Sequence, residues 1–170
     1  MEYVTLGRTG VQVSRLALGT GNFGTGWGHG ADPATARAIL DAYVAAGGNF
    51  IDTSDVYQFG QSEQILGDAL HGRRDDVVLA TKYSSGATPG ANRLATGNSR
   101  RAMVTSVEAS LKRLKTDRID LYWVHHPDPV TPSEEIVRGL DDLTRAGKIL
   151  HAGLSNFPAG GWCGRRRWPS

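Results

Sequence analysis

The sequence predicts an α/β protein of the (β/α)8 TIM-barrel type, incomplete, with about five of the eight β/α units and an N-terminal β-hairpin. Short apolar segments alternate along the chain with segments of helical periodicity, which is typical of parallel strands joined by helices. Polar residues follow the apolar segments at their carboxyl ends, where the active-site loops of barrels begin. The chain has 170 residues, fewer than the roughly 250 of a complete barrel.

The N-terminal part predicts a hairpin, the first barrel strand and a glycine-rich loop. Two β-prone runs flank a turn at residues 7–10, and a third run ends at Gly19 and Thr20. The run GTGNFG at residues 19–24 matches the dinucleotide-binding pattern G-x-G-x-x-G, but that pattern must open directly into a helix. Because the first helix signal comes only at Asp32, we interpret the run as a loop and prefer a barrel to an open doubly wound sheet.

Four segments with helical periodicity alternate with the strands. Asp32 is expected to cap the first helix, with Pro33 at its first position, and Ser62 is expected to cap the second. Thr131 and Glu134 are expected to form a capping box for the fourth. The apolar residues expected on the buried faces are Ile39, Leu40 and Tyr43; Ile65, Leu66, Ala69 and Leu70; Val104, Val107, Leu111 and Leu114; and Ile136, Val137, Leu140 and Leu143.

Four further strand segments carry polar residues that can perform chemistry. The segments are NFIDTSDVY at residues 49–57, VVLATKYS at 77–84, IDLYWVHHPD at 119–128 and LHAGLSNF at 150–157. The polar residues are, in chain order, Asp52, Tyr57, Lys82, His125, Ser155 and Asn156. Because the carboxyl ends of parallel strands meet at one rim of a barrel, we expect these side chains to gather there.

Composition and charge argue against several other classes of protein. The chain is 39% hydrophobic and 21% charged, so it can bury a core, and no apolar stretch approaches the roughly 20 residues that span a bilayer. We therefore expect a cytoplasmic protein that does not bind membranes. The single cysteine, Cys163, cannot form an internal disulfide. The net charge of the chain is +2. The three arginines at 165–167 contribute +3, so residues 1–157 carry a net charge of −1. Because this part of the chain is nearly neutral, nucleic-acid binding is not expected.

In this order and spacing the motifs resemble the aldo-keto reductase family, from about Val4 to Phe157. The resemblance rests on FIDTSDVY, GQSEQILGDAL, ATKY, DLYWVHHPD and GLSNF, together with the hairpin. It implies an NADPH-dependent enzyme that reduces a small carbonyl substrate, an aldehyde or a ketone, to an alcohol. The catalytic residues that it implies are Asp52, Tyr57, Lys82 and His125. The cofactor-binding residues that it implies are Gly19, Thr20, Asp52, Ser155 and Asn156.

The chemistry of carbonyl reduction agrees with these catalytic residues. Hydride addition leaves negative charge on the carbonyl oxygen, so a positioned proton donor must meet it, and Tyr57 is the candidate. An ammonium at Lys82 would ease release of the tyrosine proton, and Asp52 would hold that lysine in place. His125 is expected to orient the carbonyl group and to share the proton relay.

Each of these four residues also has a structural interpretation, as a loop cap, a packing residue, a solvated lysine or a core histidine. Their joint placement on three successive strands favours the catalytic interpretation. Asp55 alone keeps the structural interpretation, as a loop cap. Trp27 and Trp123 are candidate walls of a substrate pocket, although core packing explains Trp123 equally well.

Two other functions stay open. His125, His126 and Asp128 would suit a metal-dependent hydrolase, but adjacent histidines in a strand point to opposite faces, so we expect no metal there. The other alternative is a non-catalytic, reductase-like subunit that binds a partner protein through an open edge of the sheet.

The chain departs from the family after the fifth strand. Residues 158–170 lack helical periodicity, and we expect them to be an atypical, disordered tail, the mark of a truncated or frameshifted reading frame, after a partial barrel at residues 1–157. Five strands cannot close a barrel, so the first and fifth would expose unpaired edges. We therefore expect a poorly stable chain that self-associates through these edges. Neither the particular substrate nor the basis of a preference for NADPH is encoded in these residues.

Overall fold

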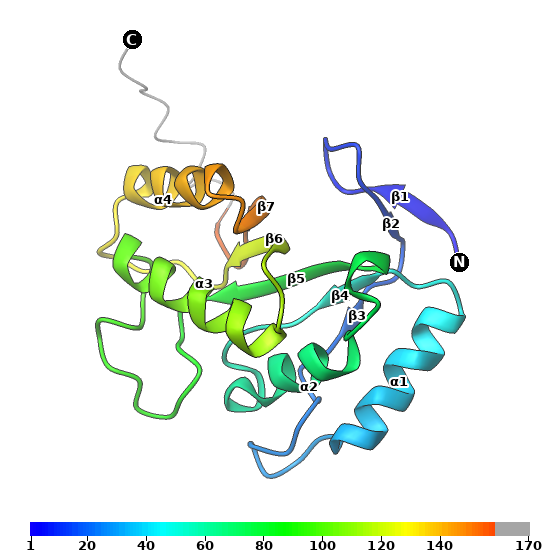
Figure 1. Ribbon diagram of the computed structural model, residues 1–170. Helices are drawn as coiled ribbons and strands as arrows, with labels where there is room; N and C mark the ends of the chain where they lie inside the picture. The colour runs from blue at the N-terminus through cyan, green and yellow to red at the C-terminus, as the bar shows by residue number, and fades with distance from the viewer. Residues whose placement is uncertain (159–170) are drawn as a thin grey trace.

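The computed structural model describes residues 1–158, and its centre is a five-stranded parallel sheet in the order β3-β4-β5-β6-β7. Figure 1 shows α1 to α4 on the outside of the curved sheet and the antiparallel hairpin of β1 and β2 at one end. The strands are β1 (Tyr3–Thr5), β2 (Gln12–Ser14), β3 (Leu18–Gly19), β4 (Phe50–Asp52), β5 (Val78–Tyr83), β6 (Ile119–Val124) and β7 (Ile149–Leu154). Apart from Pro158, the predicted tail lies outside the described residues.

Helical segments connect the successive parallel strands. They are α1 (Pro33–Ala45), η1 (Tyr57–Gly60), α2 (Gln61–Ala69), η2 (Arg74–Asp76), α3 (Arg100–Leu114) and α4 (Ser133–Arg145), where η denotes a 3₁₀ turn. The α-helices contact one another in chain order, α1 with α2, α2 with α3, and α3 with α4. This is the arrangement of consecutive β/α units around a barrel. Within residues 1–158, no helix is long and apolar enough to cross a membrane.

The first helix begins where the sequence predicts. The Asp32 carboxylate accepts a hydrogen bond from the Thr35 amide at 2.9 Å, and Pro33 occupies the first helical position. The prediction that Ile39 lies on the buried face was wrong, because its side chain is exposed. The buried stripe of α1 runs through Leu40, and adjacent helical residues point about 100° apart, so only one of this pair can face the sheet.

The third helix shows the same kind of difference. Ser99 caps α3 by accepting a hydrogen bond from the Ala102 amide at 3.2 Å. The buried face contains Met103 and Val107, as helical spacing requires, whereas Val104 was wrongly predicted to lie on it and is exposed. The sequence does not distinguish an apolar residue beside the buried stripe of a helix from one within the stripe.

Two predicted helix caps do not form, because their side chains are used elsewhere. Ser62 lies inside α2, and its hydroxyl is 2.9 Å from the Thr20 hydroxyl at the end of β3. The α4 helix begins at Ser133 without a side-chain cap. Thr131, the predicted cap, donates its amide and hydroxyl protons to the Asp128 carboxylate at 2.6 and 2.8 Å. The capping box is therefore replaced by a turn closed on an aspartate.

The glycine-rich run forms a loop, as predicted, and α1 begins only after it. Gly30 has a φ of +127°, and a Cβ at this position would lie 2.1 Å from the Gly24 carbonyl oxygen, so only glycine fits. Two glutamines hold the loop in place: Gln61 Oε1 accepts from the Thr25 amide at 2.8 Å, and Gln58 contacts the loop farther along.

The hydrophobic core lies between the sheet and its helices. Leu79 and Tyr83 of β5 and Tyr122 of β6 are buried, and the two tyrosine rings stack with centroids 5.1 Å apart. Side chains alternate between the faces of a strand, so Lys82, next to Tyr83, points to the inner face. The core and the candidate site therefore use opposite faces of the same strands.

Candidate active site

The carboxyl ends of β4, β5 and β6 bring three predicted site residues together. Asp52 is the last residue of β4, Lys82 lies next to the end of β5, and His125 directly follows β6. These strands are neighbours in the sheet, with Asp52 in register with Ala80 and Lys82 in register with Trp123. The rim that the strand segments predict is therefore present for these three residues.

Lys82 is the centre of the polar contacts at this rim. Its Nζ donates to Asp52 Oδ2 at 2.5 Å, to the Thr53 carbonyl oxygen at 2.8 Å and to Tyr57 Oη at 3.2 Å. The lysine side chain is 9% exposed and the aspartate side chain 29%, so the ion pair is largely withdrawn from water. An ammonium held in this way stabilises negative charge on the tyrosine oxygen.

Tyr57 reaches the site from a 3₁₀ turn rather than from a strand. The predicted strand through Tyr57 was too long, because β4 ends at Asp52 and η1 begins at Tyr57. Gln58 and Phe59 follow with φ of 51° and 55°, a left-handed conformation that costs energy for residues other than glycine. The buried Gln58 side chain accepts from the Trp27 amide at 2.8 Å, which ties this strained turn to the glycine-rich loop.

The two candidate wall tryptophans have different environments. Trp27 lies edge-on to Tyr57, with ring centroids 6.2 Å apart, and edge-on to Phe59 at 6.4 Å. It therefore stands beside the candidate proton donor. Trp123 packs over β7, where a Cβ on Gly153 would lie 2.3 Å from its ring. Its buried Nε1 has no hydrogen-bond partner within the described chain, as expected of a side chain held by packing.

His125 lies beside Tyr57, with the rings edge-on and their centroids 6.1 Å apart. Its Nδ1 is 3.2 Å from the Ser54 hydroxyl. Burial, together with the nearby His126 imidazole and Lys82 ammonium, lowers the pKa of His125 to about 4. The ring is therefore neutral near pH 7, with one nitrogen as a hydrogen-bond donor and the other as an acceptor.

The prediction that His125 and His126 point to opposite faces was wrong. Their rings stack, with centroids 4.2 Å apart and planes 14° apart. The alternation of a strand does not apply to them, because β6 ends at Val124. Asp128, the third candidate ligand, accepts from the Asn98 amide at 2.7 Å and from its own loop. Within residues 1–158, no group of three or more potential ligands could hold a metal ion.

Besides Asp52, three of the residues expected to bind a cofactor border the rim. Ser155 and Asn156 directly follow β7, and Asn156 Nδ2 donates to the His125 carbonyl oxygen at 2.9 Å. Gly19 ends β3 and is exposed, with open space where a Cβ would point. These residues lie at both ends of the row of strands that carries Asp52, Lys82 and His125.

Thr20 differs from the other expected cofactor residues, because its side chain is fully buried. Its hydroxyl donates to the Asp52 carbonyl oxygen at 3.2 Å and lies 2.9 Å from the Ser62 hydroxyl. Ser62 in turn lies 2.9 Å from the Thr53 hydroxyl. These contacts tie the end of β3 to β4 and α2, and they engage the threonine hydroxyl inside the protein.

A second polar cluster, which sequence analysis missed, lies behind the rim. Asp55 is 1% exposed, and Glu63 is fully buried. Arg113 Nε and Thr81 Oγ1 each donate to the Glu63 carboxylate at 2.6 Å. Burial and the Glu63 charge raise the pKa of Asp55 to about 7, while Arg113 acts in the opposite direction. The structural interpretation of Asp55 stays a prediction.

Close packing of α2 on α3 brings Glu63 to Arg113. A Cβ on Gly67 would lie 2.4 Å from the Arg113 carbonyl oxygen, so the helices approach where α2 has no side chain. The sequence holds a partial signal, since Glu63 and Gly67 are four residues apart and share a helix face. The arginine is 50 residues farther along the chain, which no local spacing predicts.

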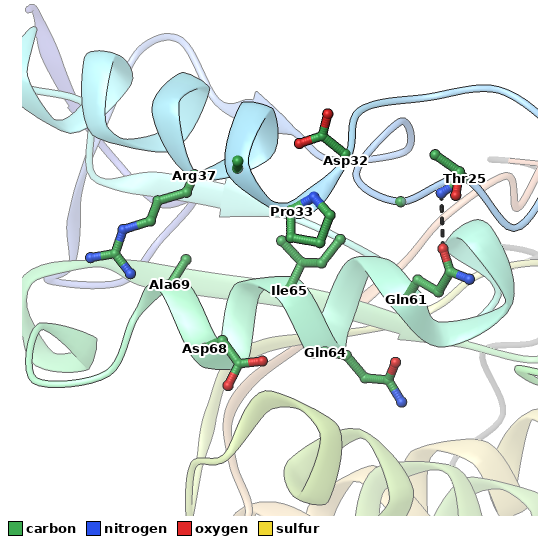
Figure 2. Close-up of a pocket in the computed structure, with 11 residues that line it drawn as sticks. Thr25, Asp32, Pro33, Arg37, Gln61, Gln64, Ile65, Asp68 and Ala69 are labelled. Carbon is green, nitrogen blue, oxygen red and sulfur yellow. Dashed lines mark hydrogen bonds between the residues drawn. The ribbon is translucent and has the colours of Figure 1, made fainter.

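A separate groove of about 680 Å³ lies between α1 and α2. Figure 2 shows Thr25 and Gln61, joined by their hydrogen bond, at one end of the groove and Arg37 at the other. The residues that line the groove include none of the four expected catalytic residues and none of the expected cofactor residues.

The parallel strand order and the β/α connections place the chain in the (β/α)8-barrel class. The Aldo/keto reductase family model matches residues 15–162, and the chain belongs to this family. Aldo-keto reductase YhdN of Bacillus subtilis is 46% identical over 160 residues, which cover 92% of this chain and 47% of that protein. Norsolorinic acid reductase of Aspergillus flavus is 44% identical over 160 residues, which cover 88% of this chain and 41% of that protein.

A solved structure supports the same assignment. The holo form of aldo-keto reductase AKR11C1 from Bacillus halodurans matches with a TM-score of 0.83 and 32% sequence identity, over 96% of this chain and 53% of that chain. The predicted fold class, an incomplete (β/α)8 barrel with an N-terminal hairpin, is confirmed. The chain spans about half the length of the relatives that it matches.

Proposed function

We propose that this chain carries the catalytic residues of an NADPH-dependent reductase of aldehydes or ketones, with Tyr57 as the proton donor. The observation that supports this proposal is the position of Lys82 Nζ, which contacts both the Tyr57 hydroxyl and the Asp52 carboxylate. A lysine in this place has a clear task in proton transfer from tyrosine. It has none in a metal-dependent hydrolase.

NADPH, when bound, supplies a hydride to the carbonyl carbon. The electron pair of the C=O bond then moves onto the oxygen, which takes the proton of Tyr57 and becomes an alcohol. The Lys82 ammonium stabilises the tyrosinate that remains, and Asp52 keeps the ammonium in position. His125, which is neutral, orients the carbonyl oxygen through a hydrogen bond from its ring.

The chain offers suitable groups for the nicotinamide end of the cofactor. Ser155 and Asn156 have hydroxyl and amide groups that match a carboxamide, and Gly19 leaves room at the opposite side of the rim. We include Asp52 because its carboxylate is partly exposed at the same rim. Thr20 would contribute by positioning, through the contacts of its buried hydroxyl, rather than by direct contact.

The test compares NADPH binding and NADPH oxidation in the Tyr57→Phe variant and the parent chain, with an aromatic aldehyde as the probe substrate. We expect turnover to fall by about 10²- to 10⁴-fold while fluorescence titration shows unchanged NADPH binding, because only the proton donor is removed. Tyr122→Phe is the matched control, since that hydroxyl is buried on the core face without a hydrogen-bond partner within residues 1–158. Unchanged turnover in Tyr57→Phe would overturn the assigned role.

The two alternative functions receive less support. The two relatives from Bacillus subtilis and Aspergillus flavus are both named as reductases. The carboxylate of Asp128, a candidate metal ligand, already accepts hydrogen bonds from backbone amides. A non-catalytic subunit would bind its partner without needing Tyr57. NADPH binding without turnover, together with partner binding unaffected by Tyr57→Phe, would favour that alternative.

We also propose that the chain associates with a second copy through the edge of β7. Within residues 1–158, β7 pairs only with β6, and Leu150 and Ala152 are exposed on its surface. Sedimentation should show a dimer or larger species, and Leu150→Lys should shift it toward the monomer. Val130→Lys, in an exposed loop, is the control and should have no effect. A monomer at every concentration of the parent chain would contradict this proposal.

A further inference from the structure

Ser54 links the buried polar cluster to the rim. The serine is fully buried, and its hydroxyl lies 3.3 Å from Asp55 Oδ1 and 3.2 Å from His125 Nδ1. A hydroxyl has one proton and can donate it to only one of these two neighbours at a time. The direction of the serine hydrogen bond therefore couples the state of the aspartate to the state of the histidine.

The linked groups have two consistent arrangements. When Asp55 carries a proton, it donates to the Ser54 oxygen, the serine donates to His125 Nδ1, and the histidine proton must be on Nε2. When Asp55 is ionised, it accepts from Ser54, the serine oxygen accepts from Nδ1–H, and Nε2 has only a lone pair. The first arrangement becomes the second when the Nε2 proton leaves, the Ser54 proton moves to His125 Nδ1, and the Asp55 proton moves to the Ser54 oxygen.

The surroundings of Asp55 favour the protonated carboxyl below about pH 7. Glu63 on α2 faces Asp55 with a negative charge, and Arg113 on α3 forms its ion pair with Glu63, at 2.6 Å. Tyr122 on β6 also faces the carboxyl, and its buried hydroxyl stays neutral because burial raises its pKa far above the usual range. Burial among these neighbours raises the pKa of Asp55 to about 7, so the carboxyl ionises within the pH range in which most enzymes are active.

The surroundings of His125 keep its ring neutral in the same range. His126 stacks on it, Tyr57 meets it edge-on, and the Lys82 ammonium disfavours a second positive charge. With Nδ1 bound to Ser54, Nε2 is the ring nitrogen left for a substrate. Only the tautomer with hydrogen on Nε2 can donate to a carbonyl oxygen.

We propose that Asp55 is a positioning residue that acts through Ser54 to keep the proton of His125 on Nε2. The use of this proton toward a carbonyl substrate rests on the proposed reductase function, whereas the tautomer is a property of the chain alone. Ionisation of Asp55 switches the tautomer and removes the donor. The population with Nε2–H falls about tenfold for each pH unit above the point of half ionisation.

The test is long-range proton–nitrogen NMR of the chain with ¹⁵N-labelled histidine, from about pH 5 to about pH 9. The His125 signals are those lost in His125→Gln. In the parent chain we expect hydrogen on Nε2 at low pH and on Nδ1 at high pH, with the change near pH 7. In Ser54→Ala and in Asp55→Asn we expect a tautomer that does not change with pH. Either variant alone suffices if the other does not fold.

Ser62→Ala is the matched control, because Ser62 is an equally buried, hydrogen-bonded serine that contacts Thr20 and Thr53 instead of the histidine. It should leave the tautomer change in place. A change that persists in Ser54→Ala, or its absence from the parent chain, would overturn the proposal. The NMR experiment uses no cofactor or substrate, so loss of the reductase proposal would not alter its result. Where turnover is measurable, its decline above pH 7 should disappear in Asp55→Asn.

Discussion

Asp52 and Asp55 lie three residues apart, on either side of the end of β4, and their environments are opposite. The Asp52 side chain is 29% exposed and is bonded to the Lys82 ammonium at 2.5 Å. Asp55 is 1% exposed, and its carboxyl lies 3.3 Å from the neutral hydroxyl of Ser54. At the rim a carboxylate is paired with a cation, and behind the rim a carboxyl of the same type keeps a proton.

The difference shows how one short segment can serve two purposes. Behind the rim, within residues 1–158, Asp55 and Glu63 share one cation, Arg113, which is bonded to Glu63. A second buried negative charge would lack a partner and cost several kcal/mol, so a proton on Asp55 is the less costly state. The rim holds a charged pair for chemistry, and the buried cluster holds a proton that can be released near pH 7.

The largest effect on stability is expected when Arg113 is removed. Arg113→Met would leave the fully buried Glu63 carboxylate without its cation, and breaking such a buried pair costs about 3–5 kcal/mol. Urea unfolding followed by tryptophan fluorescence measures the loss. The double variant Glu63→Gln/Arg113→Met removes both charges and should recover most of it. If the double variant is as unstable as the single one, the unpaired charge is not the cause.

Removal of the cation at the rim should have a smaller effect on stability. Lys82→Met leaves Asp52, which water reaches, so we expect a loss of about 1.5–3 kcal/mol, the range for hydrogen bonds to charged groups. Lys112→Met, on the exposed surface of α3, is the control and should change the unfolding free energy little. A loss larger than that of Arg113→Met would reverse the comparison between rim and cluster.

Asp55 and His125 should have opposite effects on stability between about pH 4 and about pH 6.5. The folded state holds a proton on Asp55 that the unfolded chain has lost, because the pKa of this carboxyl is raised to about 7, so its contribution falls as pH rises. The folded state leaves His125 neutral where the unfolded chain protonates it, because its pKa is lowered to about 4, so its contribution rises with pH. The two slopes, each at most about 1.4 kcal/mol per pH unit, largely cancel.

Single substitutions should uncover the two slopes. In Asp55→Asn the unfolding free energy should rise with pH across this window, and in His125→Gln it should fall. Urea unfolding at three pH values between about 4.5 and 6.5 measures both slopes against the parent chain. If both variants have the slope of the parent chain, neither group titrates as its surroundings indicate.

The rim could be predicted from the sequence because its signals are local. Asp52, Lys82 and His125 each lie at or beside the end of an apolar segment, and the order of the segments gives the order of the strands. Tyr57 was found by the same pattern although it lies on a 3₁₀ turn. The contacts of Thr20 could not be predicted, because they depend on a hydroxyl from another element.

The buried cluster could not be predicted, because it depends on contacts between distant elements. Glu63 meets Arg113 only after α2 and α3 pack together, and Ser54 meets His125 across 71 residues of sequence. The stacking of His125 on His126 was also hidden, since it depends on where β6 ends rather than on residue type. Hydrophobic periodicity places elements, but it does not report which polar side chains meet between them.

The smallest effect is expected for Arg15→Met, the same substitution at an exposed ion pair. Arg15 Nη1 lies 2.8 Å from Glu2, close to the 2.6 Å between Arg113 and Glu63, but both of its side chains are 66% exposed. Water replaces the lost partner there, so the unfolding free energy should change by less than about 0.5 kcal/mol, and any loss should vanish at high salt. The two pairs match in distance and in residue type. The difference between the losses of unfolding free energy in the Arg113 and Arg15 variants therefore reports the effect of burial. Equal losses would mean that burial does not set the strength of these pairs, and the explanation given for the proton on Asp55 would fail with it.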